Sequence, residues 1–249
     1  MKFKDLPYER VDFEAAGKEL DALIADFKNA ASGEEAFAVH ERYYKLIGRI
    51  STLYTIANIR FDIDTADKFY EAEVEYYDEQ YPAFDSKTLL YKEAMLESPF
   101  REYLTEKIGE VAFTNLEIAK KAMDEKLVPL KQEENNLVTE YTKLIASAKI
   151  EFDGKELNIS LLRPYLISSD RSVRKAAWAK LSAFFSDNRE KLDEIYDKLV
   201  KNRTAQAREM GYENFVELGY YRMGRNCYGK EEVESFRKQV KEYFVPFAE

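Results

Sequence analysis

The only histidine of the chain, His40, opens the string HERYY, which begins like the zinc-binding motif HExxH. In that motif the second histidine lies four residues further on, one turn along the same helical face, and this chain has Tyr44 there. A catalytic zinc ion typically needs three protein ligands, most of them histidines. The string therefore indicates a histidine on the apolar face of a helix, with Tyr44 on the same face, and not a metal ligand.

Two other patterns suggest chemistry only at first sight. The single thiol, Cys227, is the only cysteine that His40 could activate as a nucleophile, and nothing in the sequence places the two together. The run from Gly219 to Asn226 has the glycine spacing of a phosphate-binding loop. Arg225 and Asn226 replace the lysine and the hydroxyl residue of that loop, and no predicted strand precedes it. Neither pattern predicts a catalytic site.

Acidic residues gather between Glu71 and Glu79. Carboxylate-bridged metal sites in helical bundles also need a Glu-x-x-His pair on two helices, which one histidine cannot supply. Glu71, Glu75 and Glu79 follow one another at intervals of one helical turn, so the run predicts a solvated helix face.

The segment from Arg203 to Tyr228 combines glycines, arginines and tyrosines at the end of a predicted long helix. Four side chains here could present guanidinium and phenol groups to a carbonyl or a carboxylate, which suits the forked geometry of arginine. They are Tyr221, Arg222, Arg225 and Tyr228. The alternative is that they tie the segment to neighbouring helices through buried hydrogen bonds.

The elements around this segment follow from local signals. Apolar residues repeat at helical spacing from Leu192 to Met210, and Gly211 then supplies a helix end, because glycine tolerates positive φ. A short helix is predicted over residues 212–219. A last helix is predicted over residues 230–249, with no capping signal at its end and one apolar stripe. The stripe consists of Val233, Phe236, Val240, Tyr243, Phe244 and Phe247.

The rest of the chain predicts a mainly α fold, a bundle-like array of about ten helices with one small β-hairpin near residues 149–159. Ser32 and Glu35 form a capping box at the start of one long helix. Asp153-Gly154 suits a two-residue type I′ turn, which would place Ile150 opposite Leu157. A hairpin this small is marginal alone, so we expect it to lie on helices.

Composition narrows the function classes. The net charge of −9 argues against a nucleic-acid partner, whose phosphates need a basic surface. A single cysteine allows no intramolecular disulfide, and no apolar run is long enough to cross a membrane or to form a signal peptide. We therefore expect a cytoplasmic protein without a membrane partner.

Several long stretches carry a family resemblance. They are PYERVDFEA near the start, the block EENNLVTEYTKLIASAKIEFDGKELNISLL, SSDRSVRKAAW after it, and GYENFVELGYYRMGRNCY. In these stretches, and in the order in which they occur, the chain resembles the oligoendopeptidase F family of zinc metallopeptidases, which are thimet oligopeptidase-like. One position departs from the family pattern R-x-D-Y, since Cys227 stands where that pattern has aspartate.

The resemblance implies a cytoplasmic zinc enzyme that hydrolyses short unstructured peptides in an enclosed channel. Its zinc motif HExxH lies downstream of the matching region, so the chain is expected to be the N-terminal half of a longer enzyme. It implies an N-terminal helical lobe over residues 1–185 and the start of the catalytic domain over residues 186–249. On this basis the chain alone is predicted to be inactive, with no catalytic residue and no zinc of its own. Its expected partner is the missing C-terminal catalytic half. The four side chains named above then become candidates for lining the substrate channel.

A different class of function fits the same residues. The chain could be a stand-alone helical module that binds proteins or peptides and has no catalytic activity. In that case the stripe on the last helix should be buried internally or in a dimer. A part of a larger enzyme should instead expose the stripe as an apolar patch.

Overall fold

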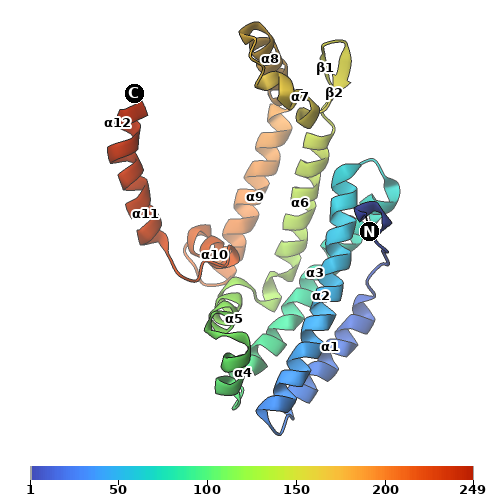
Figure 1. Cartoon of the computed structure of the whole chain (residues 1–249), viewed down its shortest axis with the longest axis vertical. Helices are drawn as coiled ribbons and strands as arrows, with labels where there is room; N and C mark the ends of the chain where they lie inside the picture. The colour runs from blue at the N-terminus through green and yellow to red at the C-terminus, as the bar shows by residue number, and fades with distance from the viewer. Residues whose placement is uncertain (1, 249) are drawn as a thin grey trace. The chain divides into compact units, whose positions relative to one another are not determined.

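The computed structural model describes residues 2–248 and confirms the mainly α fold with one hairpin (Figure 1). The chain divides into two units, and three of the five boundaries between them fall inside long helices. The first unit comprises residues 1–13, 47–82 and 128–205, and the second comprises residues 14–46, 83–127 and 206–249. None of the helices within residues 2–248 is both long enough and apolar enough to cross a membrane.

The elements of the first unit are a short 3-10 helix η1 (Phe3–Asp5), the later part of α2 (Gly33–Ile63), the earlier part of α3 (Lys68–Leu96), α6 (Val128–Ala146), β1 (Ile150–Phe152), β2 (Lys155–Leu157), α7 (Ile159–Leu166), α8 (Arg171–Asp187) and most of α9 (Arg189–Glu209). Those of the second unit are α1 (Phe13–Lys28), the remaining parts of α2, α3 and α9, α4 (Arg101–Ile108), α5 (Glu110–Ala122), a 3-10 turn η2 (Glu125–Leu127), α10 (Phe215–Arg222), α11 (Lys230–Gln239), a π-helical turn η3 (Val240–Phe244) and α12 (Val245–Ala248).

In the first unit the N-terminal segment is held by a buried carboxylate on α3. Glu73 accepts hydrogen bonds from the Tyr8 hydroxyl and from the Arg10 guanidinium. Burial raises the pKa of Glu73, but these hydrogen bonds outweigh it, and its pKa lies below the usual range. The expected solvated face is therefore only partly correct, because Glu73 and Asp78 are buried while Glu75 and Glu79 are exposed.

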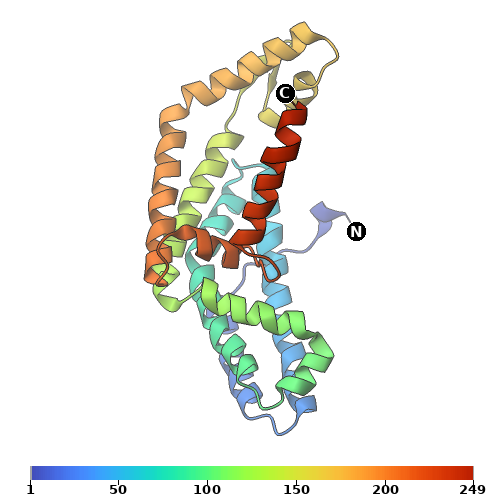
Figure 2. The same ribbon diagram turned by 90° about the vertical axis from the view of Figure 1, so that its left-hand side faces the viewer.

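Helices α6 and α9 lie side by side in the first unit and are joined by polar contacts (Figures 1 and 2). The Asn202 side chain donates to the backbone carbonyl of Leu130 at 3.0 Å. Arg203 Nε donates to Glu134 Oε1 at 2.8 Å, and Lys131 Nζ lies 3.1 Å from the other oxygen of the same carboxylate. Because Glu134 is buried, these contacts supply the charged partners that its carboxylate needs.

The hairpin has the predicted turn and register. Asp153 has φ 52° and Gly154 has φ 70°, as the predicted type I′ turn requires. Ile150 pairs with Leu157, and both contribute to a small buried core. The other members of this core come from α7 and α8 and are Leu162, Ala177 and Leu181. The expectation that the hairpin lies on helices is thus confirmed.

The second unit begins its part of α2 with the serine half of the predicted capping box, while Glu35 reaches the residue before the cap instead of the cap itself. The Glu35 backbone N–H donates to Ser32 Oγ at 3.2 Å, and the Glu35 carboxylate accepts from the backbone N–H of Ala31. The buried face of this helix differs from the prediction by one position, since Tyr43 is buried and Tyr44 is 68% exposed. The core of the unit contains fully buried side chains from several helices, including Leu20, Leu23, Leu104, Phe113 and Leu218.

Helix α9 ends at Glu209, and Gly211 closes it as the sequence predicts. Gly211 has φ 84°, its N–H donates to the carbonyl of Arg208, and the N–H of Tyr212 donates to the carbonyl of Ala207. This pair of bonds is a Schellman motif, in which a glycine reverses the chain and the last carbonyls keep a partner. The turn directs the chain into α10.

Candidate functional site

Helix α10 begins three residues later than predicted, at Phe215. The side chain of Asn214 accepts a hydrogen bond from the N–H of Val216 at 2.9 Å and so caps the helix. Asparagine at this position is among the most favourable N-caps. The prediction of residues 212–219 is therefore wrong in its limits, and Tyr221 and Arg222 lie in the last helical turn instead of an irregular run.

Helix α10 packs on α5, with Leu218 completely buried. The Tyr212 hydroxyl donates to the backbone carbonyl of Lys121 at the end of α5, at 3.0 Å. After α10, the Asn226 side chain donates to Asn115 Oδ1 on α5 at 2.9 Å. The segment before α10 and the loop after it are thus both tied to the same helix.

A second Schellman motif ends α10 and sets the position of Arg225. Gly224 has φ 63°, its N–H donates to the carbonyl of Tyr221, and the N–H of Arg225 donates to the carbonyl of Tyr220. In this motif the residue after the glycine contacts the residue three positions before the helix cap. Here that contact is between Arg225 and Tyr220, and the guanidinium carbon lies 4.1 Å from the centre of the tyrosine ring.

Arg225 also contacts a second ring. Its guanidinium carbon lies 5.2 Å from the centre of Tyr228, within the range of cation–π attraction. No ion pair or side-chain hydrogen bond of this guanidinium occurs among residues 2–248. The two rings therefore hold the cation in place while its N–H donors remain available.

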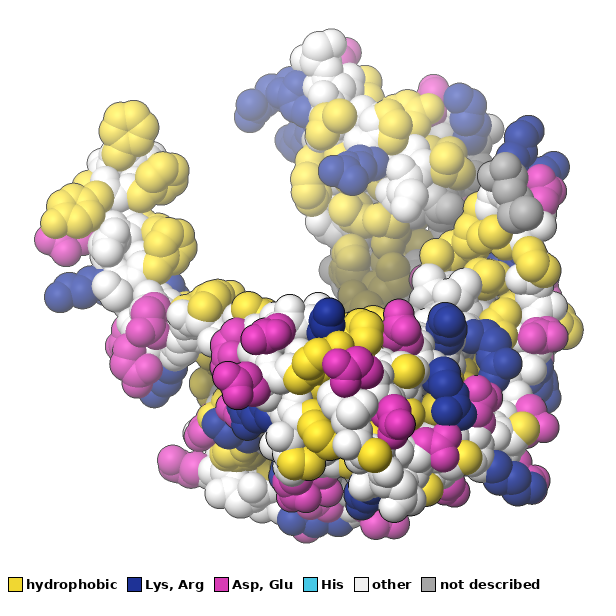
Figure 3. Space-filling model, turned by 60° about the horizontal axis from the view of Figure 1, so that its bottom comes forward, with side chains coloured by type: hydrophobic (Ala, Val, Ile, Leu, Met, Phe, Trp, Pro, Cys, Tyr) yellow, Lys and Arg dark blue, Asp and Glu magenta, His cyan; other side chains and the backbone are white. Residues whose placement is uncertain are grey.

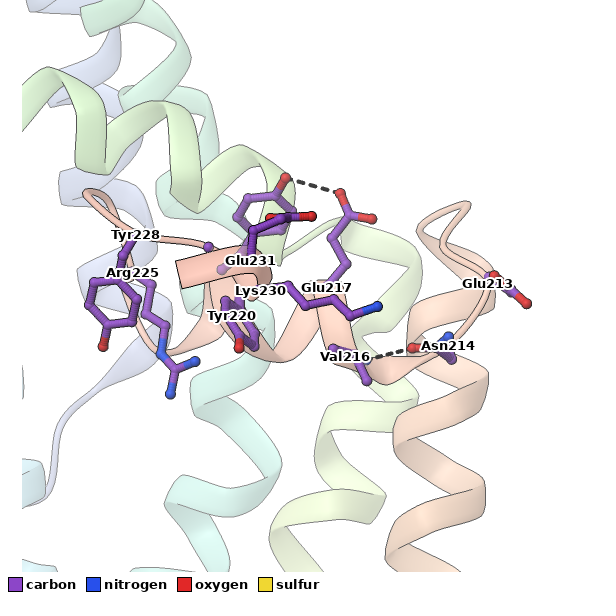
Figure 4. Close-up of a pocket in the computed structure, with 11 residues that line it drawn as sticks. Glu213, Asn214, Val216, Glu217, Tyr220, Arg225, Tyr228, Lys230 and Glu231 are labelled. Atoms are coloured by element: carbon purple, nitrogen blue, oxygen red, sulfur yellow. Dashed lines mark hydrogen bonds between the residues drawn. The ribbon is translucent and has the colours of Figure 1, made fainter. Parts of the chain in front are cut away.

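These residues border a cavity of about 470 Å³ between α10 and the start of α11 (Figure 4). Its lining consists of Glu213, Asn214, Val216, Glu217, Tyr220, Tyr221, Arg225, Tyr228, Gly229, Lys230 and Glu231. The charged side chains comprise three carboxylates and two cations, so the cavity carries charge of both signs.

The four predicted site residues do not all reach this cavity. Tyr221, Arg225 and Tyr228 line it, whereas Arg222 Nη1 lies 3.5 Å from Gln206 Oε1 and its guanidinium lies over the ring of Phe215. The Tyr221 hydroxyl donates to Glu217 Oε1 at 3.0 Å. Burial, together with this bond to an anion, raises the pKa of Tyr221. The phenol is therefore a neutral group near pH 7.

Tyr220, Lys230 and Glu231 are among the lining residues that sequence reasoning missed. A signal for Tyr220 was present. A glycine that closes a helix predicts that the residue after it, here Arg225, contacts a residue of the last helical turn, here Tyr220. Cys227, which stands in place of the aspartate of the family pattern, is exposed and does not line the cavity.

The structure places His40 away from any group of possible metal ligands. His40 is 7% exposed, and its Nδ1 lies 3.4 Å from the Tyr91 hydroxyl. The ring of Tyr91 stacks on that of Tyr43 at 3.8 Å between centres. Burial lowers the pKa of His40, which favours its neutral form. Within residues 2–248, no three His, Cys, Asp or Glu side chains come together in a way that could hold a metal ion.

Among protein-family models, that of the peptidase M3 N-terminal domain matches residues 3–123 of this chain. A crystal structure assigned as oligoendopeptidase F is 40% identical with a TM-score of 0.96, and the match covers 100% of this chain and 44% of that chain. Pz peptidase A, solved with inhibitor 2, is 41% identical with a TM-score of 0.95, over 99% of this chain and 44% of that chain. A protein assigned as oligoendopeptidase F from Bacillus anthracis str. Ames is 39% identical with a TM-score of 0.95, over 99% of this chain and 45% of that chain.

A comparison with curated proteins finds no match. The chain spans less than half the length of the solved structures to which it is similar. The domain match at the start and the likeness along the whole chain agree with each other. The chain belongs to the M3 peptidase family and is similar throughout to the oligoendopeptidase F members of that family.

Proposed function

We propose that the chain is the N-terminal part of a cytoplasmic, zinc-dependent oligopeptidase that hydrolyses short unstructured peptides in an enclosed channel. The observation that carries this proposal is the likeness to oligoendopeptidase F at 40% identity, which covers the whole of this chain and 44% of the other. In this proposal, the helices form a wall of the channel and limit entry to peptides without folded structure.

The residues of this chain do not fit a catalytic zinc ion. Such an ion requires about three protein ligands, and the sole histidine is buried beside Tyr91. We therefore assign the zinc and its HExxH motif to a region outside these 249 residues. The contribution of this chain is to bind the peptide, to orient it and to exclude water.

The cavity beside α10 is the candidate for contact with the peptide. Tyr221, Arg225 and Tyr228 would offer phenol and guanidinium donors to it, and all three line the same space. Arg222 would act indirectly, since its contacts with Gln206 and Phe215 hold α10 in position.

The apolar stripe of the last helix supports a role within a larger enzyme. Phe236, Tyr243, Phe244 and Phe247 are between 65% and 87% exposed. Figure 3 shows hydrophobic side chains along the segment that Figure 1 labels α11 and α12. We propose that the stripe packs against the catalytic half of the enzyme. A self-contained binding module would bury these side chains, so their exposure favours the enzyme over the module.

The test is to incubate the purified chain with a quenched fluorescent peptide, with and without added Zn²⁺, and to measure bound metal by mass spectrometry. We expect no cleavage and no stoichiometric zinc. His40→Ala, purified in the same way, is the matched control for contaminating proteases. Zinc-stoichiometric cleavage that the wild-type chain shows and His40→Ala lacks would overturn the proposal that the reaction centre lies elsewhere.

A further inference from the structure

We infer that Arg225 binds the free C-terminal carboxylate of a short peptide and that the cavity beside α10 is a site for that end of the substrate. This inference rests on the proposed function, because it assigns a substrate group to the cavity assigned there to peptide contact. It goes further in naming which end of the peptide is bound and which side chain binds it.

The first argument is the preorganisation of the guanidinium. The guanidinium carbon lies 4.1 Å from the ring centre of Tyr220 and 5.2 Å from that of Tyr228, and within residues 2–248 no hydrogen bond uses the N–H edge of the group. The two parallel N–H donors on that edge match the two oxygens of a carboxylate. Because the contacts with the two rings already restrict the Arg225 side chain, less side-chain freedom is lost on binding than for a mobile arginine.

The second argument is the distribution of charge in the cavity. Figure 4 shows Arg225 and Tyr228 at one end and Glu213 at the other, with Glu217 and Glu231 between them. Three carboxylates against the two cations Arg225 and Lys230 disfavour a simple anion, since like charges in one site repel. A ligand that carries a carboxylate at one end and a cationic group further along satisfies both ends. A short peptide with a free C terminus and a basic residue is such a ligand.

The third argument is size. A volume of about 470 Å³ lies within the range of small-ligand sites and accommodates only a few residues of a peptide. The opening between α10 and α11 thus suits the end of a chain better than the middle of a folded surface.

The test is calorimetric titration of the full chain with three unstructured peptides of one basic sequence. The first has a free C-terminal carboxylate, the second a C-terminal amide, and the third the same amide with an added acidic side chain. Hydrogen bonds to a charged group contribute enough that we expect the amide to bind at least about tenfold more weakly. Recovery of affinity by the third peptide would mean that any carboxylate suffices, and would overturn the assignment to the C terminus.

Variants identify the side chain. Arg225→Gln should abolish the preference for the free acid over the amide, whereas a merely structural role would weaken the binding of both peptides equally and keep the preference. Arg225→Lys should restore only part of the preference, because an ammonium group lacks the fork. Arg208→Gln removes an exposed cation at the end of α9, outside the cavity, and serves as the charge-matched control.

The titrations distinguish failure of the role of Arg225 from failure of peptide binding by the cavity. Equal affinity of the wild-type chain for acid and amide would overturn the role of Arg225 and leave peptide binding by the chain intact. Absence of binding by all three peptides would overturn both the role of Arg225 and the assignment of the cavity to the substrate.

Discussion

Removing Arg203 should destabilise the first unit through a buried carboxylate on the neighbouring helix. The side chain of Glu134 is 3% exposed and accepts from Arg203 Nε at 2.8 Å. Arg203→Ala leaves that carboxylate with Lys131 at 3.1 Å as its remaining ion-pair partner. A buried charge that loses a donor loses stabilisation that water cannot fully replace.

The expected loss in the free energy of unfolding follows from how far Arg203 and Glu134 are exposed to water. Complete loss of the partner of a buried charge costs about 3–5 kcal/mol, but Lys131 stays in place. A hydrogen bond to a charged group contributes about 1.5–3 kcal/mol. Because the side chain of Arg203 is 37% exposed, water can approach the vacated position. We therefore expect a loss at the lower end of that range, about 1.5–2 kcal/mol in the free energy of unfolding.

The assay is urea denaturation followed by the fluorescence of Trp178, the only tryptophan, which lies in the same unit. The matched control is Lys198→Ala, which removes an exposed pair with Glu194 on the same helix. That change should lower the free energy of unfolding far less, because both partners are solvent-exposed. The comparison requires that the slope of the free energy of unfolding against urea concentration is the same in both variants. If Arg203→Ala then shifts the unfolding midpoint no further than Lys198→Ala does, Arg203 does not stabilise the buried carboxylate of Glu134.

Two further predictions concern the second unit. Burial lowers the pKa of His40 below its ordinary 6.5, so the folded state disfavours the imidazolium, and stability should be constant above pH 6.5 and decrease as the pH falls below it. Proton NMR of the single imidazole gives that pKa directly, and a value at or above 6.5 would contradict the assignment. Replacing Phe236 and Phe244 with serine should reduce the fluorescence of a dye that binds apolar surface, since both rings are more than half exposed. An unchanged signal would place the dye-binding surface elsewhere.

Local signals in the sequence predicted the local structure well. The hairpin depends on Asp153 and Gly154, and the end of α9 depends on Gly211, and each of these residues has positive φ. In these cases the residue itself determines which backbone conformations are allowed. The start of α10 was missed because Asn214, which caps it, follows directly on another turn at Gly211. Two adjacent turn signals leave the first residue of the helix undetermined.

Long-range pairing could not be predicted from one sequence. Glu73 belongs to an acidic run that resembles a solvated face, and it is buried because Tyr8 and Arg10, more than 60 residues earlier, supply its donors. The candidate site was predicted in part, since arginines and tyrosines were recognised without their geometry. Which ring contacts Arg225, and that Arg222 points elsewhere, depends on how the chain turns at Gly224.

The π-helical turn at residues 240–244 has a geometric consequence for the aromatic stripe of the last helix. In an α-helix a step of four residues exceeds one turn of 3.6 residues, so positions four apart advance about 40° around the axis with each step. A π turn contains more residues, and the same step falls short of a full revolution. The step from Val240 to Phe244 therefore rotates back what the step from Phe236 to Val240 added. Phe236 and Phe244 are therefore expected nearly one above the other along the helix axis, with Val240 to one side, so a flat partner surface can meet both rings.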